Sequence, residues 1–257
     1  MIAAELVRYR ALVWALARRD LLARYRGTVL GFGWTLLHPL IYLAAYSVIF
    51  GKVARLDVPR YPAFLFSGLL PWTWFSSSVL VGTTSILADA PLVKRAAFPA
   101  SVPPLVVALA SLANFLFALP VLAAVLLANG VRPTPALVAL PLVIALQFAL
   151  GLGIATGLAA LTVRLRDVAQ LSQALAPLLF IMTPIAYPSG LLEAELGPAA
   201  VWANPLALLA RSWQSVLWAG TLPRPLELAA LAGYAALALA LGSFVLERLR
   251  DRIPEEL

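Results

Sequence analysis

Long apolar runs, separated by short charged or proline-rich stretches, set the pattern of this chain. Each run holds about the 20 mostly apolar residues that a helix needs to cross a bilayer. The runs cover residues 30–50, 63–88, 101–128, 136–163, 168–187 and 226–246. The pattern predicts an all-α integral membrane protein with six transmembrane helices.

The first 27 residues follow a different pattern. Apolar residues recur there at steps of three and four, as on one face of a helix: Ile2, Leu6, Tyr9, Leu12, Val13 and Leu16. Arg18 lies on the opposite face, and more arginines follow it. A basic amphipathic helix of this kind lies in the headgroup region with its apolar face down. We therefore expect an N-terminal interfacial helix on the membrane surface.

The stretch from residue 199 to residue 220 is long enough to pass for a seventh span. Pro205 and Arg211 interrupt it, and its three tryptophans are typical of a membrane–water interface. Pro184 and Pro188 lie just before it. Irregular backbone at membrane depth is tolerated only where protein or a water-filled cavity covers it. We expect broken or re-entrant helices between spans five and six, and a candidate lining for an exit.

Charge is scarce and unevenly placed. The chain is 62% hydrophobic and 12% charged, whereas soluble domains are about 25% charged. Its net charge of +7 comes from residues at the ends of the apolar runs. This placement favours anionic lipid headgroups as the partner and gives no sign of nucleic-acid binding.

The charge distribution also predicts the orientation. With six spans, thirteen of the nineteen Lys and Arg residues fall on the side that holds both termini. The positive-inside rule places that side in the cytoplasm. We expect one transmembrane domain over residues 1–257, with an interfacial part at 1–27, a membrane region at 28–248 and a cytoplasmic tail at 249–257.

Catalytic and cofactor motifs are missing from the sequence. There is no cysteine, and His38 is the single histidine, so thiolate chemistry and multi-histidine metal sites are excluded. The chain has no Walker A sequence, and no carboxylate lies in the middle of a span. We therefore predict no enzyme activity, no metal and no cofactor in this chain itself.

Several stretches resemble a known family when taken in order. They are "RDLLARYRGTVLGFGWTLLHPL", "LVKRAAFPASVPP", "VRLRDVAQ", "LLFIMTPIAYPSGLL" and "NPLALLARSWQ". Together they resemble ABC exporter permeases for O-antigen, teichoic acid and related polysaccharides, over nearly the whole chain. One departure is Met182-Thr183-Pro184, where many members have Ser-Pro, and the hydroxyl is retained.

The resemblance implies a transport subunit of the bacterial cytoplasmic (inner) membrane with both termini in the cytoplasm. It implies a homodimer with two separate nucleotide-binding ATPase subunits, which would bind the ATP and Mg. The cargo would be a lipid-linked glycan that passes through a channel at the dimer interface.

Aromatic residues at steps of four mark the first span: Trp34, His38, Tyr42, Tyr46 and Phe50. Steps of four drift by only about 40° on a helix of 3.6 residues per turn, so the rings form a slowly spiralling stripe. The stripe could guide sugars by their C–H faces, or it could pack against helices and lipid. Given the resemblance, we expect a substrate path formed by Trp34, Tyr42, Tyr46, Phe50, Phe180 and Tyr187.

Two charged cytoplasmic loops are candidates for contact with the ATPase. In view of the resemblance we expect docking through Asp89, Lys94, Arg95, Arg164, Arg166 and Asp167. The alternative is solvated positive-inside charge with no further role. Thr28, Leu30 and Gly31 are expected to form a gate where the chain turns into the first span.

Other functions stay open from the sequence. A permease of the same superfamily could export a drug or a lipid with the same architecture. A membrane-embedded glycosyl or acyl transferase would need acid or histidine chemistry, for which the chain offers Glu193, Glu195 and His38. A third alternative is a membrane scaffold without a transport function, but this function would not explain the interrupted stretch after Pro184.

Overall fold

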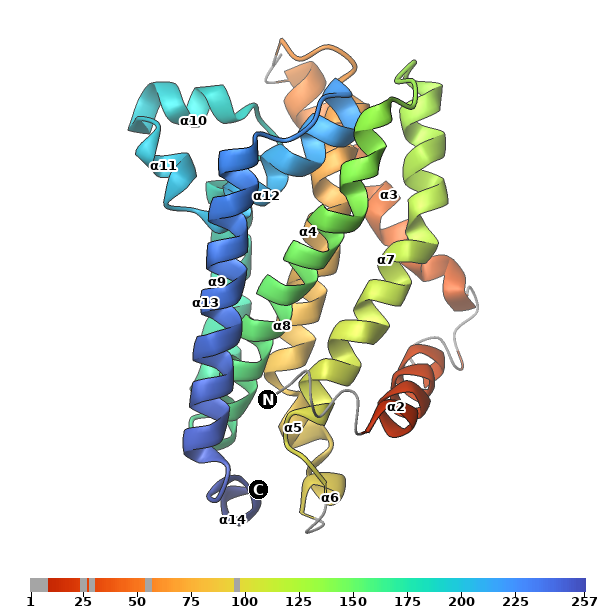
Figure 1. Ribbon diagram of the computed structural model, residues 1–257. Helices are drawn as coiled ribbons and strands as arrows, with labels where there is room; N and C mark the ends of the chain where they lie inside the picture. The colour runs from red at the N-terminus through yellow and green to blue at the C-terminus, as the bar shows by residue number, and fades with distance from the viewer. Residues whose placement is uncertain (1–8, 24–26, 28–30, 54–56, 95–97) are drawn as a thin grey trace.

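The computed structural model describes residues 9–23, 27, 31–53, 57–94 and 98–257, and the regular elements in these parts are helices (Figure 1). The longer helices are α2 (Arg10–Ala23), α3 (Trp34–Tyr46), α4 (Tyr61–Thr83), α7 (Val102–Ala128), α8 (Leu140–Arg164), α9 (Asp167–Met182), α10 (Ser189–Leu196), α12 (Pro205–Gln214) and α13 (Pro225–Leu249). The short ones are η1 (Gly31–Gly33), α5 (Ser85–Ala88), α6 (Ala90–Val93), η3 (Pro135–Ala139), α11 (Ala199–Trp202) and α14 (Ile253–Glu256). The π-helical turns η2 (Ser47–Val53) and η4 (Ser215–Ala219) extend α3 and α12.

Four of the six predicted spans are helices long and apolar enough to cross a membrane. They are Tyr61–Thr83, Val102–Ala128, Pro135–Arg164 and Pro225–Leu249. The counterparts of the first and fifth spans are shorter apolar helices, Leu36–Gly51 and Asp167–Met182. The second run, predicted to continue to residue 88, is broken at Thr84 into α4 and α5.

Helix α9 stops at Met182, five residues before the predicted end of the fifth span. Thr183 is extended, with φ −99° and ψ 130°, because the proline that follows it disfavours helical backbone at the preceding position. The non-helical segment of residues 183–188 begins here. The proline therefore sets the length of this span.

The N-terminal helix α2 lies against the beginning of α7 (Figure 1). Val13 and Ala17 are buried there in a cluster with Val102 and Leu105 of α7. Leu12 of the predicted apolar face is exposed, whereas Val13 and Ala17 face α7. The described part of the helix thus packs on protein through Val13 and Ala17, while Ile2 and Leu6 of the predicted apolar face lie outside the described residues.

Helices α8 and α13 approach closely through glycines. A Cβ on Gly153 would overlap the backbone of Ala238 and Leu239, and a Cβ on Gly242 would overlap the carbonyl of Gly153. Gly157 also meets the backbone of Gly242. Small residues allow backbones to approach in this way in helix pairs of membrane proteins. The two helices are therefore joined by close backbone contact.

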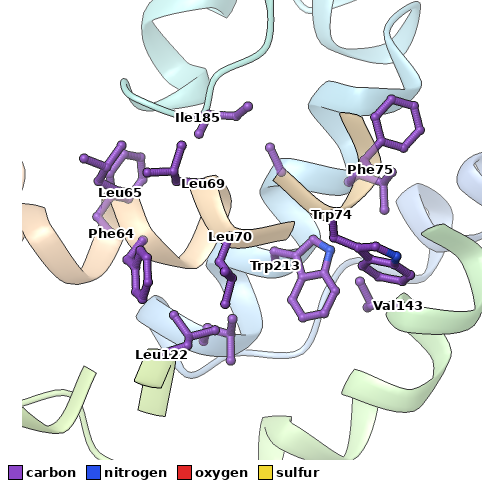
Figure 2. Close-up of a cluster of buried hydrophobic side chains, with 14 of the residues drawn as sticks. Phe64, Leu65, Leu69, Leu70, Trp74, Phe75, Leu122, Val143, Ile185 and Trp213 are labelled. Carbon is purple, nitrogen blue, oxygen red and sulfur yellow. The ribbon is translucent and has the colours of Figure 1, made fainter. Parts of the chain in front are cut away.

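The main hydrophobic core lies where α4 meets α7, α8 and α12, and Figure 2 shows part of it around Leu70 and Trp74. Trp213 of α12 is buried in this core at 1% exposure, although tryptophans of this stretch were expected at an interface. Its Nε1 donates a hydrogen bond of 2.7 Å to Oε1 of Gln147, whose Nε2 donates to the carbonyl of Pro71 at 2.9 Å. A buried indole needs such a partner for its N–H, and here the partner fixes α12 to α8 and α4.

The stretch between α9 and α13 is a set of broken helices, as the sequence predicted. Asn204 caps α12, because its Oδ1 accepts a hydrogen bond of 3.0 Å from the backbone N–H of Leu206, and Pro205 occupies the first turn. This pairing follows the usual preference for Asn at the cap and Pro just inside a helix. Figure 1 shows α10 and α11 at one end of the long helices and α5, α6 and α14 at the other.

Side chains satisfy the irregular backbone of residues 183–188. Tyr61 donates its hydroxyl to the carbonyl of Ala186 at 2.7 Å. Gln214 donates to the carbonyls of Pro184 and Ile185 at 3.1 and 3.3 Å. Because unpaired carbonyls are costly away from water, these bonds allow a non-helical segment to be buried between α4 and α12.

Candidate functional site

An aromatic groove lies between α3, α4 and α9. It has a volume of about 580 Å³, and Tyr42, Tyr46 and Phe50 line it from α3 and its π-helical extension. Phe180 of α9 and Trp72 of α4 complete its aromatic wall. We call this feature the aromatic groove. Four of the six residues predicted for a substrate path therefore lie together.

The rings of the groove are in contact with one another. Tyr46 is the centre, with ring centroids 6.2 Å from Tyr42, 6.1 Å from Phe50 and 5.3 Å from Phe180. Trp72 lies 5.6 Å from Phe180. Tyr42 is 50% exposed, whereas Tyr46 and Phe50 are partly buried against the main core. The stripe therefore combines helix packing at Tyr46 with an open aromatic surface at Tyr42.

Polar side chains also line the groove, and the sequence analysis did not select them. Thr73 and Ser76 come from α4, and Gln173 comes from α9. These residues lie inside long apolar runs, where a polar side chain is expensive unless it has a partner or faces water. Two features of the sequence could have pointed to these groove residues. One is the presence of polar residues inside apolar runs, and the other is Trp72 next to Pro71.

The other two predicted path residues lie apart from the groove or at its edge. Trp34 packs on His38, with ring centroids 5.0 Å apart, in a second cavity that shares Tyr42 with the groove. Tyr187 lies in the non-helical segment after α9, and its hydroxyl donates a hydrogen bond of 2.9 Å to the carbonyl of Ile181. Tyr187 is thus not brought together with the stripe of α3.

The predicted docking residues lie on two neighbouring segments. Asp89 is the residue between α5 and α6, and Lys94 follows α6 and is exposed. Arg164, Arg166 and Asp167 are exposed at the junction of α8 and α9. A hydrophobic cluster that contains Ile86, Val93 and Val163 packs these two segments together. The structure therefore brings the second and fourth loops to one end.

Asp89 also has a partner within the chain. Its Oδ1 lies 3.4 Å from Nη2 of Arg19, which joins α2 to the second loop. Exposed ion pairs of this kind contribute about 0–1 kcal/mol, so the pair orients the loop more than it stabilises the fold. Gly31, one of the residues expected at the gate, begins η1 with φ +50°. The predictions for Thr28, Leu30 and Arg95 lie outside the described residues.

An ion-pair cluster around the buried Glu227 lies at the end where α10 and α11 are found (Figure 1). Arg211 of α12 pairs with Glu193 of α10 and, at 3.3 Å, with Glu227 of α13, whose side chain is 3% exposed. Arg224 lies 3.7 Å from the same carboxylate. The cluster ties the broken helices to α13. Glu193, considered above as a possible catalytic acid, is engaged in this cluster.

Comparison with known proteins agrees with this architecture. Residues 11–218 match the family model described as ABC-2 type transporter. The O-antigen export system permease protein RfbA of Myxococcus xanthus is 36% identical over 254 residues, which cover 98% of both chains. Two proteins of the same name from Klebsiella pneumoniae are each 32% identical over 212 residues, or 82% of both chains.

The apolar helices and these similarities define a membrane-embedded permease, the transport component of an exporter. The chain belongs to the ABC-2 type transporter family.

Proposed function

We propose that this chain is the transmembrane subunit of an ATP-driven exporter that moves a lipid-linked polysaccharide, of the O-antigen or teichoic-acid type, across the bacterial cytoplasmic membrane. The observation that carries the proposal is the near full-length similarity to an O-antigen export permease. The aromatic groove supports it, because rings interleaved with Thr73, Ser76 and Gln173 suit the mixed apolar and hydroxyl surfaces of sugars.

The proposed topology has six spans and cytoplasmic termini, within one transmembrane domain. The positively charged ends support it: Lys94, Arg164 and the basic residues after α13 belong to the segments that pack together around α14. The two shorter helices, α3 with η2 and α9, would be the first and fifth spans. A helix of 16 residues is about 24 Å long, so α9 crosses only with the help of the non-helical segment that follows it.

The proposed assembly is a homodimer with two ATPase subunits on the cytoplasmic side, which would hold ATP and Mg. Helix α9 supports the dimer, because none of its sixteen residues is buried within the chain and most of its apolar side chains are exposed. A second copy that covered α3 and α9 would close the aromatic groove into a channel. The surface proposed for the ATPase is marked by exposed side chains before α7 and α9, which are Lys94, Arg164, Arg166 and Asp167.

The proposal is tested by reconstitution. The chain and its ATPase are incorporated into proteoliposomes that carry the lipid-linked glycan on the outer leaflet, where the ATPase also lies. We expect ATP-dependent movement of the glycan to the inside, measured by its protection from a glycosidase. The control uses an ATPase with an inactivated Walker A lysine. Glycan movement that is equal with both ATPases, or absent with both, would contradict the proposed function.

A further inference from the structure

A second cavity, of about 330 Å³, lies between α3, α4 and α7, beside the aromatic groove. Tyr42 and Thr73 line both spaces, so the two are neighbours across the same pair of helices. We call it the polar chamber. Its volume is near the lower end of the range of about 300–1,000 Å³ found for small-molecule sites.

The polar chamber gathers hydrogen-bonding side chains from three helices: His38, Thr73, Ser77, Ser111 and Asn114. Ser111 and Asn114 are the polar residues of the apolar helix α7, and their spacing of three places them on one face. Thr73 and Ser77 are four apart on α4 and lie on one face for the same reason. Polar residues thus converge on one point at mid-helix depth, where apolar residues are otherwise the rule.

Ser111 brings to the wall of the chamber a hydroxyl that has no hydrogen-bond partner among the residues that the structure describes. The residue is 3% exposed, and its Oγ is buried without a hydrogen-bond partner. A buried hydroxyl left unpaired costs about 1–3 kcal/mol. Thr73 Oγ1 donates to the carbonyl of Leu70 at 2.7 Å, which leaves its oxygen able to accept a hydrogen bond. The chamber therefore offers both donors and acceptors to a ligand.

The remaining walls define the chemistry of that ligand. Trp34 and Trp74 are aromatic walls, and Trp74 is held in place by stacking on Phe115 with centroids 4.6 Å apart. Among the described residues that line the chamber there is no Asp, Glu, Lys or Arg. A phosphate or a uronate would find no Lys or Arg to pair with here. A neutral pyranose ring has apolar C–H faces for the rings and hydroxyls for the polar groups.

We propose that the polar chamber is a binding site for one uncharged sugar unit of the glycan, set beside the aromatic groove. This inference rests on the proposed function and adds the class of sugar to it. The chamber would hold one neutral sugar by hydrogen bonds to Ser111 and Asn114, while the rest of the glycan passes over Tyr42. It makes the permease selective for glycans that contain such a unit.

The test uses the full-length protein in lipid nanodiscs. Methyl hexosides and N-acetylglucosamine are the uncharged ligands, and glucuronate, glucose 1-phosphate and glycerol phosphate are the charged ones. Binding is measured by saturation-transfer NMR for the wild type and for Ser111→Ala, Asn114→Leu and Ser78→Ala. Ser78 is a matched control, because it is a buried serine of α4 that lines neither the chamber nor the groove.

We expect an uncharged sugar to bind more tightly than any charged ligand. Ser111→Ala and Asn114→Leu should each weaken that binding about fivefold, the order expected for one lost hydrogen bond, and Ser78→Ala should bind as the wild type does. The melting temperature of Ser111→Ala should stay equal or rise, because the variant removes a hydroxyl that has no partner in the free protein.

Three results would overturn the inference: no binding of any uncharged sugar, equal or tighter binding of a charged ligand, or equal weakening by Ser111→Ala and Ser78→Ala. Tight binding of glycerol phosphate alone would identify a lipid headgroup site instead. Reconstituted export is measured in parallel. Export by the wild type without sugar binding would remove this inference and leave the proposed function intact, whereas absence of ATP-driven glycan export would remove the proposed function itself.

Discussion

The helices of this molecule pack closely on one side and leave a groove on the other. On one side α8 and α13 meet backbone to backbone at Gly153 and Gly242, with no room for a single additional carbon. On the other side α3 and α9 are short, bear large rings and leave a groove of about 580 Å³ between them and α4. Close packing by small residues holds a bundle together in lipid, where apolar burial gives helices little reason to associate. The comparison indicates that the α8–α13 side stabilises the fold, and the α3–α9 side is the one proposed to handle cargo.

The close-packed side should be the more sensitive to added volume. Gly242→Leu should leave little folded protein, because its side chain would meet the backbone of Gly153, and overpacking of this severity costs about 3 kcal/mol or more. Gly233→Leu is the matched control on the same helix, where an added Cβ meets open space. Yield of monodisperse protein and melting temperature in detergent measure the difference. Equal stability of the two variants would show that the glycine contact does not hold this side together.

The ion-pair cluster joins the broken helices to the close-packed side. Arg211→Met should destabilise the protein by about 3 kcal/mol, because it leaves the buried carboxylate of Glu227 with only the distant Arg224. The double variant Arg211→Met with Glu227→Met should recover most of that loss, since a buried pair replaced by apolar residues is often neutral. Thermal unfolding of the single and double variants measures this coupling. A double variant no more stable than Arg211→Met would mean that the cluster is not a stabilising unit of this kind.

On the open side, truncation should separate transport from stability. Tyr42→Ala should slow export several-fold with little change in melting temperature, because half of the side chain is exposed. Tyr46→Ala should lower both, since its ring packs on Phe180; the loss of stability should be smaller than the cost of about 3–5 kcal/mol for a fully buried ring, because Tyr46 is partly buried. Export in proteoliposomes and melting temperature are measured for each variant. Normal export by folded Tyr42→Ala would remove this ring from the path.

The smallest effect is expected at the proposed ATPase surface. Reversing the exposed charges, as Lys94→Glu with Arg166→Glu, should reduce glycan-coupled ATP hydrolysis a few-fold and leave membrane insertion and melting temperature unchanged, because neither side chain is buried. Reversal of Arg132, on the short connection between α7 and η3, provides the control at a position remote from these loops in the chain. Coupling that is unaffected in the double variant would place the ATPase contact elsewhere.

The sequence predicts the long helices well, because length and continuous apolarity are local properties. The runs at 101–128 and 226–246 agree with Val102–Ala128 and Pro225–Leu249 within a few residues. The break after α9 was also predictable, since Pro184 and Pro188 act on their immediate neighbours. Which residues of α2 pack on protein could not be predicted, because only the contact with α7 selects Val13 and Ala17.

The residues of the site are harder to predict from the sequence than the helices are. The stripe on α3 was visible from its spacing, but a helix that is apolar all round does not show which face meets a cavity, so Trp72 and Thr73 were missed. The bonds that support the broken stretch join residues far apart in the chain, as Trp213 joins Gln147 and Gln214 joins Pro184. Such pairs depend on how helices pack, which no local pattern contains.

The central claim is that the cargo travels along the α3–α9 side and not along α13, and photocrosslinking during export tests it most directly. The photoreactive residue p-benzoylphenylalanine replaces Tyr42 in one variant and Leu237 of α13 in another; the two native side chains are 50% and 54% exposed. The account predicts that, under ATP turnover, the variant at position 42 becomes joined to the lipid-linked glycan and the variant at position 237 does not. Equal labelling at both positions, or labelling at position 237 alone, would contradict it.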